Sequence, residues 1–195
     1  LIPIVPKLLI CFLVGSIPFA VIAMASSGID IRKVGSGNPG FNNVLRVNKA
    51  RAIIVLIGDM GKGFLASWFF WRFLQPGDSI NYGWLYGFAA VIGHCYSPFL
   101  KFNGGKGVAT SGGVMLVLYP GLAGIALAAF AIMRIAGSKL KWREAGAISS
   151  LLAWITFAML LLWLSGLQHA TNAGLMILLL SWQHRQNFRN LLKPT

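Results

Sequence analysis

Acidic residues are scarce in this chain: only 4 of its 195 residues are Asp or Glu. The carboxylates lie far apart in the sequence, at Asp30, Asp59, Asp78 and Glu144. A carboxylate metal centre or a catalytic acid pair is therefore not expected, because both need several acidic side chains close together. Cysteine is scarcer still. Cys11 and Cys95 each lie in or beside an apolar segment, so we expect neither a disulfide nor a thiolate metal site.

Several common catalytic motifs are also missing. Neither Gly-Lys pair is followed by Ser or Thr, which excludes an ordinary nucleotide-binding P-loop. The GxSxG elbow of serine hydrolases does not occur. None of the three histidines has an aspartate five residues further on, which excludes an H-x4-D catalytic motif. The sequence therefore excludes these three kinds of site.

Apolar residues dominate the composition, at 56% of the chain against 11% charged, with a mean hydropathy of +0.70. An apolar segment needs about 20 residues to cross a bilayer. We interpret seven runs as spans: the longer runs 4–25, 52–74, 122–136 and 147–167, and the shorter runs 82–96, 108–119 and 171–182. Flanking glycines, polar residues or tilt would complete the short ones. The sequence thus predicts an all-α integral membrane protein with one domain over residues 1–195 and no cleavable signal.

The net charge of +13 comes from basic residues in short loops between the apolar runs. They follow the first, third, fifth and seventh runs, at Arg32, Lys33, Arg46, Lys49, Arg51, Lys101, Lys106, Lys139, Lys141, Arg143, Arg185, Arg189 and Lys193. The intervening loops carry almost none. By the positive-inside bias, the N-terminus is outside and the C-terminus is cytoplasmic. No continuous basic face with interleaved aromatics indicates nucleic-acid binding.

One cytoplasmic loop carries a glycine-flanked lysine: Gly104, Gly105, Lys106 and Gly107. Glycines let backbone N–H groups converge on an anion, the lysine adds a full charge, and a following helix adds its dipole. Loops also use glycine freely, so this short motif is a weak signal by itself. Its meaning depends on what accompanies it.

The first cytoplasmic loop, residues 34–46, is rich in glycine and small polar side chains. Such a composition builds an anion-binding nest, with candidate phosphate ligands at Ser36, Gly37, Asn38, Gly40, Asn43 and Arg46. The alternative is a turn-rich connector, since turns use the same residues. A second loop of this kind on the same face favours the functional interpretation.

Two charged residues lie inside the second span. Asp59 and Lys62 are three residues apart and so share one helix face. Charges within a span are costly, so they usually pair and often mark function. A neutralising pair that fixes helix packing is nearly as good an explanation. We therefore take both as supporting residues rather than the reactive centre.

The histidines differ in their settings. His184 and Asn187 stand one helical turn apart at the end of the last span. The histidine could anchor at the interface or carry a proton, and the asparagine could donate to a substrate oxygen. His94 ends an apolar span and is interpreted as structural. His169 lies in an outer loop and is given no role.

These motifs, in this order, resemble the bacterial acyl-phosphate:glycerol-3-phosphate acyltransferases (PlsY family) over nearly the full chain. The matching segments are 35–46, Asp59-x-x-Lys62-Gly63, 93–110 and His184-Arg185-x-Asn187. The resemblance implies seven spans in the bacterial cytoplasmic (inner) membrane, with the active site at its cytoplasmic face. It also implies a reaction that starts phospholipid biosynthesis. A fatty acyl group passes from acyl phosphate to the sn-1 hydroxyl of glycerol 3-phosphate, giving lysophosphatidate and phosphate.

The resemblance also implies residue roles. Arg46 and Lys106 would hold phosphate, and His184 and Asn187 would orient the glycerol hydroxyl. The first-loop ligands given above would line the site. Acyl phosphate is already activated, so no cofactor, metal or covalent nucleophile is implied. The implied partners are the two substrates and the lipid bilayer, with no obligate protein partner.

The chain departs from the family pattern at Glu144, where the family usually has serine. A carboxylate facing phosphate would repel it, so we expect Glu144 to turn away and pair with Arg143 or another cation. Two alternatives stay open at this point. One is a membrane carrier for phosphate-bearing solutes, although a carrier would hold its charges near mid-bilayer. The other is a divergent acyltransferase with another donor or acceptor.

Overall fold

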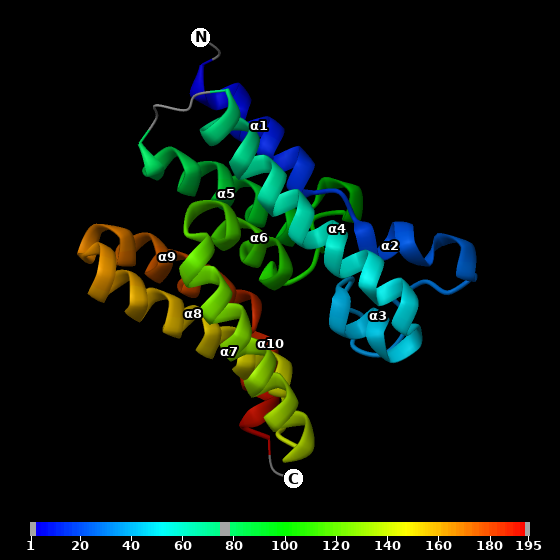
Figure 1. Cartoon of the computed structure of the whole chain (residues 1–195). Coiled ribbons are helices and arrows are strands. Elements are labelled where there is room, and N and C mark those ends of the chain that lie inside the picture. The colour runs from blue at the N-terminus through cyan, green and yellow to red at the C-terminus, as the bar shows by residue number, and fades with distance from the viewer. Residues whose placement is uncertain (1–2, 75–78, 194–195) are drawn as a thin grey trace. The chain divides into compact units, whose positions relative to one another are not determined.

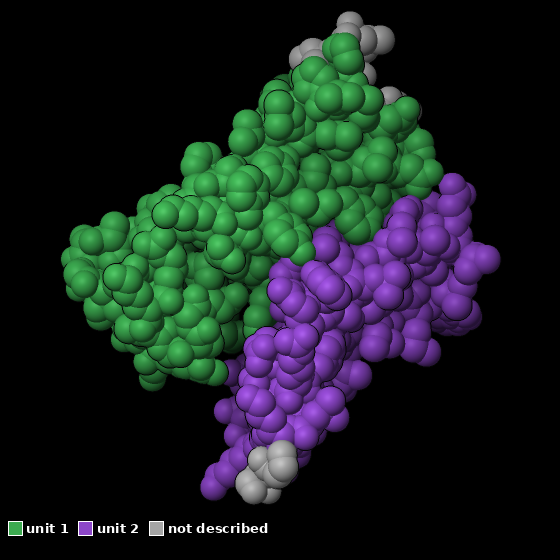
Figure 2. Space-filling model, turned by 180° about the vertical axis from the view of Figure 1, so that it is seen from behind, with its two compact units in different colours: residues 1–118 green, residues 119–195 purple. Residues whose placement is uncertain are grey.

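The computed structural model describes residues 3–74 and 79–193, and the regular elements within these ranges are all helical (Figure 1). The chain divides into two compact units, Leu1–Leu118 and Tyr119–Thr195, coloured separately in Figure 2. The prediction of an all-helical protein is confirmed for the described residues. Each unit is described by itself below.

The first predicted span is a broken helix. It consists of α1 (Ile4–Gly15), a short break, α2 (Phe19–Met24) and one 3-10 turn, η1 (Ala25–Ser27). Pro18 explains the break, because proline has no N–H to donate and its ring disfavours helical backbone at the preceding residue. The break leaves backbone carbonyls that other side chains must satisfy.

The remaining helices of the first unit surround a long central one. They are α3 (Phe41–Val47), α4 (Lys49–Ser67) continued by a π-helical turn η2 (Trp68–Phe73), α5 (Ile80–Cys95), η3 (Pro98–Leu100) and α6 (Val108–Leu118). Asn48 begins α4 by accepting a hydrogen bond from the Arg51 N–H (3.0 Å). Helix α4 packs against α1, α2, α3, α5 and α6. It thereby places Asp59 and Lys62 at the centre of this unit.

Glycines bring α4 and α6 into backbone contact. A methyl group on Gly63 would lie 2.0 Å from the Thr110 carbonyl oxygen, and one on Gly113 would lie 2.0 Å from the Met60 carbonyl oxygen. Such small-residue contacts are typical of helix pairs in membranes, where close packing replaces the hydrophobic driving force. The contact holds α6, and with it the loop that precedes α6, against the central helix.

This close approach predicts a difference between two glycines of α4. Gly63→Ala should destabilise the fold by about 1–3 kcal/mol, because the added methyl must push α6 away. Within the described residues, a methyl on Gly61 would meet nothing within 4 Å beyond its chain neighbours and its own helix backbone, so Gly61→Ala should be neutral or stabilising by up to about 1 kcal/mol. Thermal unfolding of both variants in one detergent checks this. Equal unfolding midpoints for the two variants would contradict the close contact between Gly63 and α6.

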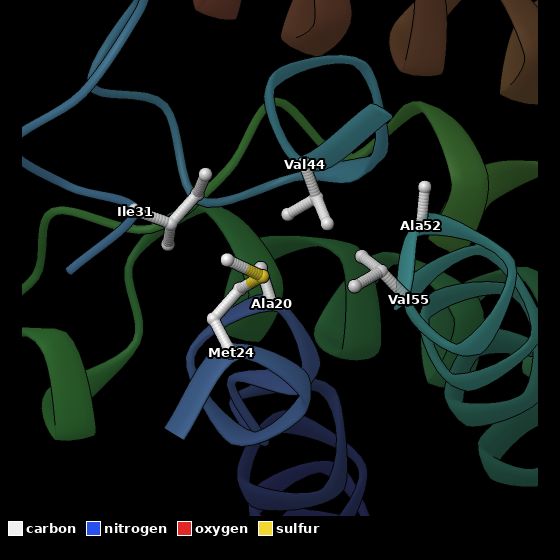
Figure 3. Packing of buried hydrophobic residues seen from close by; sticks show 6 residues of the cluster. All are labelled: Ala20, Met24, Ile31, Val44, Ala52 and Val55. Carbon is white, nitrogen blue, oxygen red and sulfur yellow. The ribbon is translucent and has the colours of Figure 1, made fainter. Parts of the chain in front are cut away.

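A small apolar core anchors the first glycine-rich loop, residues 34–46 (Figure 3). Ile31 lies just before the loop and Val44 near its end, in α3, and both are at most 1% exposed. They pack with residues of α2 and α4, namely Ala20, Met24, Ala52 and Val55. Both ends of the loop are therefore fixed to helices, and the residues between them are presented from a rigid base.

The second unit is built from four helices: α7 (Pro120–Lys139), α8 (Ala145–Ser165), α9 (Leu167–Gln183) and α10 (Arg185–Leu191). Helix α8 packs against both α7 and α9. At the end of the unit where α9 begins, the Tyr119 hydroxyl lies 2.6 Å from His169 Nδ1. At the opposite end of α9, the segment between α7 and α8 meets α10, and this end carries the candidate residues.

Four helical segments are long and apolar enough to cross a membrane: Ile4–Ser27, Lys49–Phe73, Pro120–Lys139 and Ala145–Ser165. Helix α6 is apolar but shorter. The other two predicted spans coincide with α5 and α9, of 16 and 17 residues. Every predicted apolar run thus falls on a helix. The count of seven crossings and the orientation stay predictions.

Candidate active site

Asn43 organises the first glycine-rich loop. Its Nδ2 donates to the Ile31 carbonyl (2.9 Å) and the Val34 carbonyl (3.0 Å), and its Oδ1 accepts from the Ser36 N–H (3.0 Å). Gly35 and Gly37 take positive φ values of 59° and 70° to complete the turn. Asn43 itself is buried, whereas Ser36 is exposed. The amide therefore shapes the loop and leaves Ser36 at the surface.

The three arginines around this loop differ in their interaction partners. Arg32 forms a two-pronged ion pair with Asp30, with both N···O distances 2.9 Å, and this hydrogen bonding lowers the pKa of Asp30 to about 2. Arg51 donates to Ser26 Oγ (3.2 Å). Arg46 is exposed and makes no hydrogen bond or ion pair with the described part of the chain. Of these three arginines, Arg46 is the one available to a ligand.

The lysine loop folds back on the end of α5. The Gly104 N–H donates to the Cys95 carbonyl (3.0 Å), and the Gly105 N–H donates to the His94 carbonyl (3.1 Å). These two amides are therefore already bonded within the protein. The backbone that follows, from Lys106 into the first turn of α6, continues past them, with Gly107 at φ 81°. Lys106 is partly buried.

The predicted charge pair in α4 is confirmed. Lys62 Nζ lies 2.9 Å from Asp59 Oδ1, and both side chains are almost fully buried. Lys62 Nζ also donates to the Ile17 carbonyl (2.8 Å), one of the groups left by the break in the first span. Lys62 thus donates a hydrogen bond to a carbonyl at the helix break. Each buried charge also has a partner, which an apolar environment requires.

One pocket in the first unit joins these elements. It is lined by residues 16–19 at the helix break, by Pro39 of the first loop, by Gly105 of the lysine loop, and by Leu100, Asp59, Lys62 and His94. Both glycine-rich loops therefore reach the same pocket, although Pro39 and Gly105 are 66 positions apart in the chain. Asp59, Lys62 and His94 give the lining polar groups that could bind a charged or hydroxylated ligand, and Ile17, Phe19 and Leu100 add apolar surface.

His94, which the sequence analysis interprets as structural, is buried and lines this pocket. Its Nδ1 is 3.5 Å from Asp59 Oδ1, so ring and carboxylate interact electrostatically rather than through a well-formed hydrogen bond. Two serines were missed as well. Ser97 Oγ donates to the Ser16 carbonyl (2.6 Å), and Ser16 Oγ donates to the Gly93 carbonyl (3.2 Å). Only tertiary structure brings these small residues together.

The second unit contains the remaining candidates. His184 is 3% exposed, and its Nδ1 lies 2.8 Å from the Leu180 carbonyl. A carbonyl oxygen only accepts, so Nδ1 carries the hydrogen and Nε2 is the acceptor atom of the neutral ring. Asn187 Nδ2 donates to Glu144 Oε2, and Asn190 Nδ2 donates to Glu144 Oε1 (2.8 Å). The partners of Glu144 thus include two amides that the sequence did not indicate.

The fold and the site define a helical protein with apolar helices of membrane length, in which two glycine-rich loops contribute Pro39 and Gly105 to one pocket. The family model for glycerol-3-phosphate acyltransferase matches residues 5–194. The chain therefore belongs to the glycerol-3-phosphate acyltransferase family.

Individual relatives agree with this assignment. The glycerol-3-phosphate acyltransferase of Bordetella petrii is 39% identical over 95% of this chain and 88% of its own length. Glycerol-3-phosphate acyltransferase 1 of Deinococcus radiodurans is 42% identical over 96% of this chain and 91% of its own length. Among solved structures, PlsY (YgiH), an integral membrane glycerol 3-phosphate acyltransferase in its glycerol 3-phosphate form, has a TM-score of 0.82 at 30% identity and covers 97% of this chain and 92% of that one. Its lysophosphatidic acid form has a TM-score of 0.82 at 29% identity.

Proposed function

We propose that this protein transfers a fatty acyl group from acyl phosphate to the sn-1 hydroxyl of glycerol 3-phosphate. The products are 1-acyl-glycerol 3-phosphate and inorganic phosphate. The observation that carries the proposal is the pocket of the first unit, because Pro39 and Gly105 bring two separate anion-type loops to one place. Two anionic substrates account for two such loops better than one substrate does.

The proposed phosphate ligands differ in how they act. Arg46 supplies a charge that is exposed and not engaged by other described residues. Lys106 supplies the second charge, next to the N-terminus of α6. Ser36, Gly37, Asn38 and Gly40 line the first loop, while Asn43 shapes it from behind. Gly104 and Gly105 set the path of the lysine loop, and the amides from Lys106 onward face the anion.

The reaction needs no covalent enzyme intermediate. The glycerol hydroxyl attacks the acyl carbon, a new ester C–O bond forms, and the bond between the acyl carbon and the phosphate oxygen breaks. The hydroxyl proton ends on the released phosphate, so the step balances without ATP or a cofactor. Cations around the leaving phosphate favour this step, because negative charge builds up there in the transition state.

His184 and Asn187 are proposed to orient the glycerol hydroxyl. The Nδ1 contact with Leu180 leaves Nε2 as the ring's acceptor atom, which suits a hydrogen bond from a hydroxyl. Glu144 supports this end of the second unit by accepting from Asn187 and Asn190. In this arrangement Glu144 binds amides rather than substrate phosphate.

The proposed topology is seven spans within one membrane domain, with the N-terminus outside, the C-terminus cytoplasmic and the site at the cytoplasmic face of the bacterial inner membrane. The one-sided distribution of basic residues supports it. Cysteine labelling at exposed Lys101 and Leu192, tested from each side of sealed vesicles, checks the orientation. Labelling of either position from the outer side would contradict it.

A donor comparison tests the proposed reaction. The purified protein is given glycerol 3-phosphate with palmitoyl phosphate, with palmitoyl-coenzyme A or with palmitoyl thioester on acyl carrier protein. We expect product from palmitoyl phosphate alone, with the acyl chain at sn-1 by NMR. Turnover of a thioester donor in preference to acyl phosphate would overturn the donor assignment. Uptake of glycerol 3-phosphate into liposomes without acyl transfer would favour a carrier instead.

A further inference from the structure

We infer that His94 is a positioning residue for the Lys106 loop, meaning residues 104–107. It links the buried pair of Asp59 and Lys62 to the backbone of Gly105, directly before Lys106. The inference deepens the proposed function and rests on Lys106 as a phosphate ligand. It concerns the first unit alone.

The first step is the backbone alignment of the loop. His94 lies in the last turn of α5, and its carbonyl accepts from the Gly105 N–H at 3.1 Å. The adjacent Cys95 carbonyl accepts from the Gly104 N–H at 3.0 Å. Both bonds involve main-chain atoms, so they persist whatever side chain occupies position 94. They align the loop with α5. The distance between the loop and the other side of the pocket depends instead on the side chain of His94.

The second step is the contact of the imidazole with the loop. A methyl group on Gly105 would lie 2.2 Å from His94 Nε2 and 2.9 Å from Cε1, both far too close for real atoms. The ring therefore packs directly against the backbone of Gly105. At 7% exposed, the ring has little space in which to move away. The edge of the imidazole thus sets how closely the loop approaches the other side of the pocket.

The third step is what holds the ring in place. Its other ring nitrogen, Nδ1, lies 3.5 Å from Asp59 Oδ1. The same carboxylate oxygen is held by Lys62 Nζ at 2.9 Å, and Lys62 is held in turn by the Ile17 carbonyl. The imidazole is therefore wedged between a fixed charge pair and a glycine backbone. Contacts run from the broken first span to the residue next to Lys106.

This arrangement explains why glycine occupies position 105. Any side chain there must displace the imidazole or lift the loop, and a displacement of about 1 Å at a substrate-positioning group can cost about 100-fold in rate. His94→Ala should lower kcat/KM by about 10-fold or more, mainly through a higher KM for the phosphate-bearing substrates. The fold should survive, because the two backbone bonds remain.

A double-mutant cycle tests the inference, using acyl transfer from palmitoyl phosphate to glycerol 3-phosphate. The variants are His94→Ala, Gly105→Ala and the two combined. Gly105→Ala alone should be the most impaired, because its methyl meets the ring. The combined variant should recover at least about 10-fold over Gly105→Ala, because removal of the ring makes room. Additive losses in the combined variant would overturn the inference.

Two further measurements separate positioning from general stability. His94→Asn keeps an N–H near the position of Nδ1 and should retain more activity than His94→Ala. Unfolding midpoints of all variants should not follow their KM values. If the loss of activity tracks the loss of stability, or if asparagine rescues nothing, the positioning role is wrong.

Lys106→Ala is assayed alongside to keep the two proposals apart. An inactive Lys106→Ala with an additive cycle would refute only the role of His94. A fully active Lys106→Ala would refute the phosphate cradle itself.

Discussion

Replacing Lys106 by alanine is expected to lower kcat/KM for acyl transfer by about 100-fold or more. The loss of a single charge-stabilising donor at a reacting centre typically costs about 100- to 1,000-fold. Lys106 is partly buried, and it lies between a glycine pair whose amides are bonded to the end of α5 and the N-terminus of α6. Steady-state kinetics with palmitoyl phosphate and glycerol 3-phosphate provide the measurement.

A second lysine in the same segment provides the matched control. Lys101 is exposed and takes a left-handed backbone conformation, with φ 50°. Lys101→Asn removes the same charge while keeping a residue that tolerates this conformation. Its activity should stay within about twofold of the parent protein, as expected for an exposed charge away from the site. Equal losses of activity in the two variants would indicate a general effect of net charge and would contradict a specific role of Lys106.

Removing the carboxylate of Asp59 is expected to destabilise the fold by about 3–5 kcal/mol, since it leaves a buried charge without its partner. Asp59 is 2% exposed, and Lys62 Nζ, 2.9 Å away, is fixed to the Ile17 carbonyl. Asp59→Ala should therefore unfold at a much lower temperature in detergent. Activity should fall with it, because His94 also loses the group that faces its Nδ1.

Two comparisons test the cause of this loss. The double variant Asp59→Leu with Lys62→Met removes both charges, so it should be more stable than Asp59→Ala alone, although the Ile17 carbonyl then keeps only the Phe19 N–H (3.1 Å) of its two donors. Asp30→Ala breaks an ion pair at the surface and should leave the unfolding midpoint unchanged. A midpoint for Asp59→Ala as high as that for Asp30→Ala would show that the buried pair contributes nothing.

Much of the helical fold could be predicted, because apolar runs of membrane length leave few alternatives to helix. Each predicted run corresponds to a helix in the described residues. The break in the first span was missed, because averaging hydropathy over a run conceals one residue. Pro18 was the available signal, since proline within a helical pattern ends or kinks the helix. The short helices α3 and α10 were also missed, since they lie in polar segments that hydropathy does not register.

The site was predictable where its geometry is local. Asp59 and Lys62 share a helix face by spacing alone, and their ion pair is confirmed. The uses of the Gly104 and Gly105 amides were not predictable, because their acceptors are the carbonyls of Cys95 and His94, reached only through the folded loop. Glycine content indicates that backbone N–H groups are accessible. It does not say whether the protein itself will use them.

Glu144 shows the same limit in the second unit. Its departure from the family serine was visible, and the expectation was that the carboxylate would seek a cation. In the structure, the Glu144 carboxylate accepts hydrogen bonds from the side-chain amides of Asn187 and Asn190. Those donors follow Glu144 by more than 40 residues and lie in a short helix that no apolar run indicates.

The most direct test of the central claim is the stoichiometry of the reaction. Purified protein is incubated with palmitoyl phosphate carrying ¹⁸O in the bridging position, and phosphate and lysophosphatidate are quantified together. The proposed reaction predicts one labelled phosphate per lysophosphatidate, with neither formed at an appreciable rate without glycerol 3-phosphate. Phosphate release that is independent of glycerol 3-phosphate, or ¹⁸O retained in the lipid product, would contradict it.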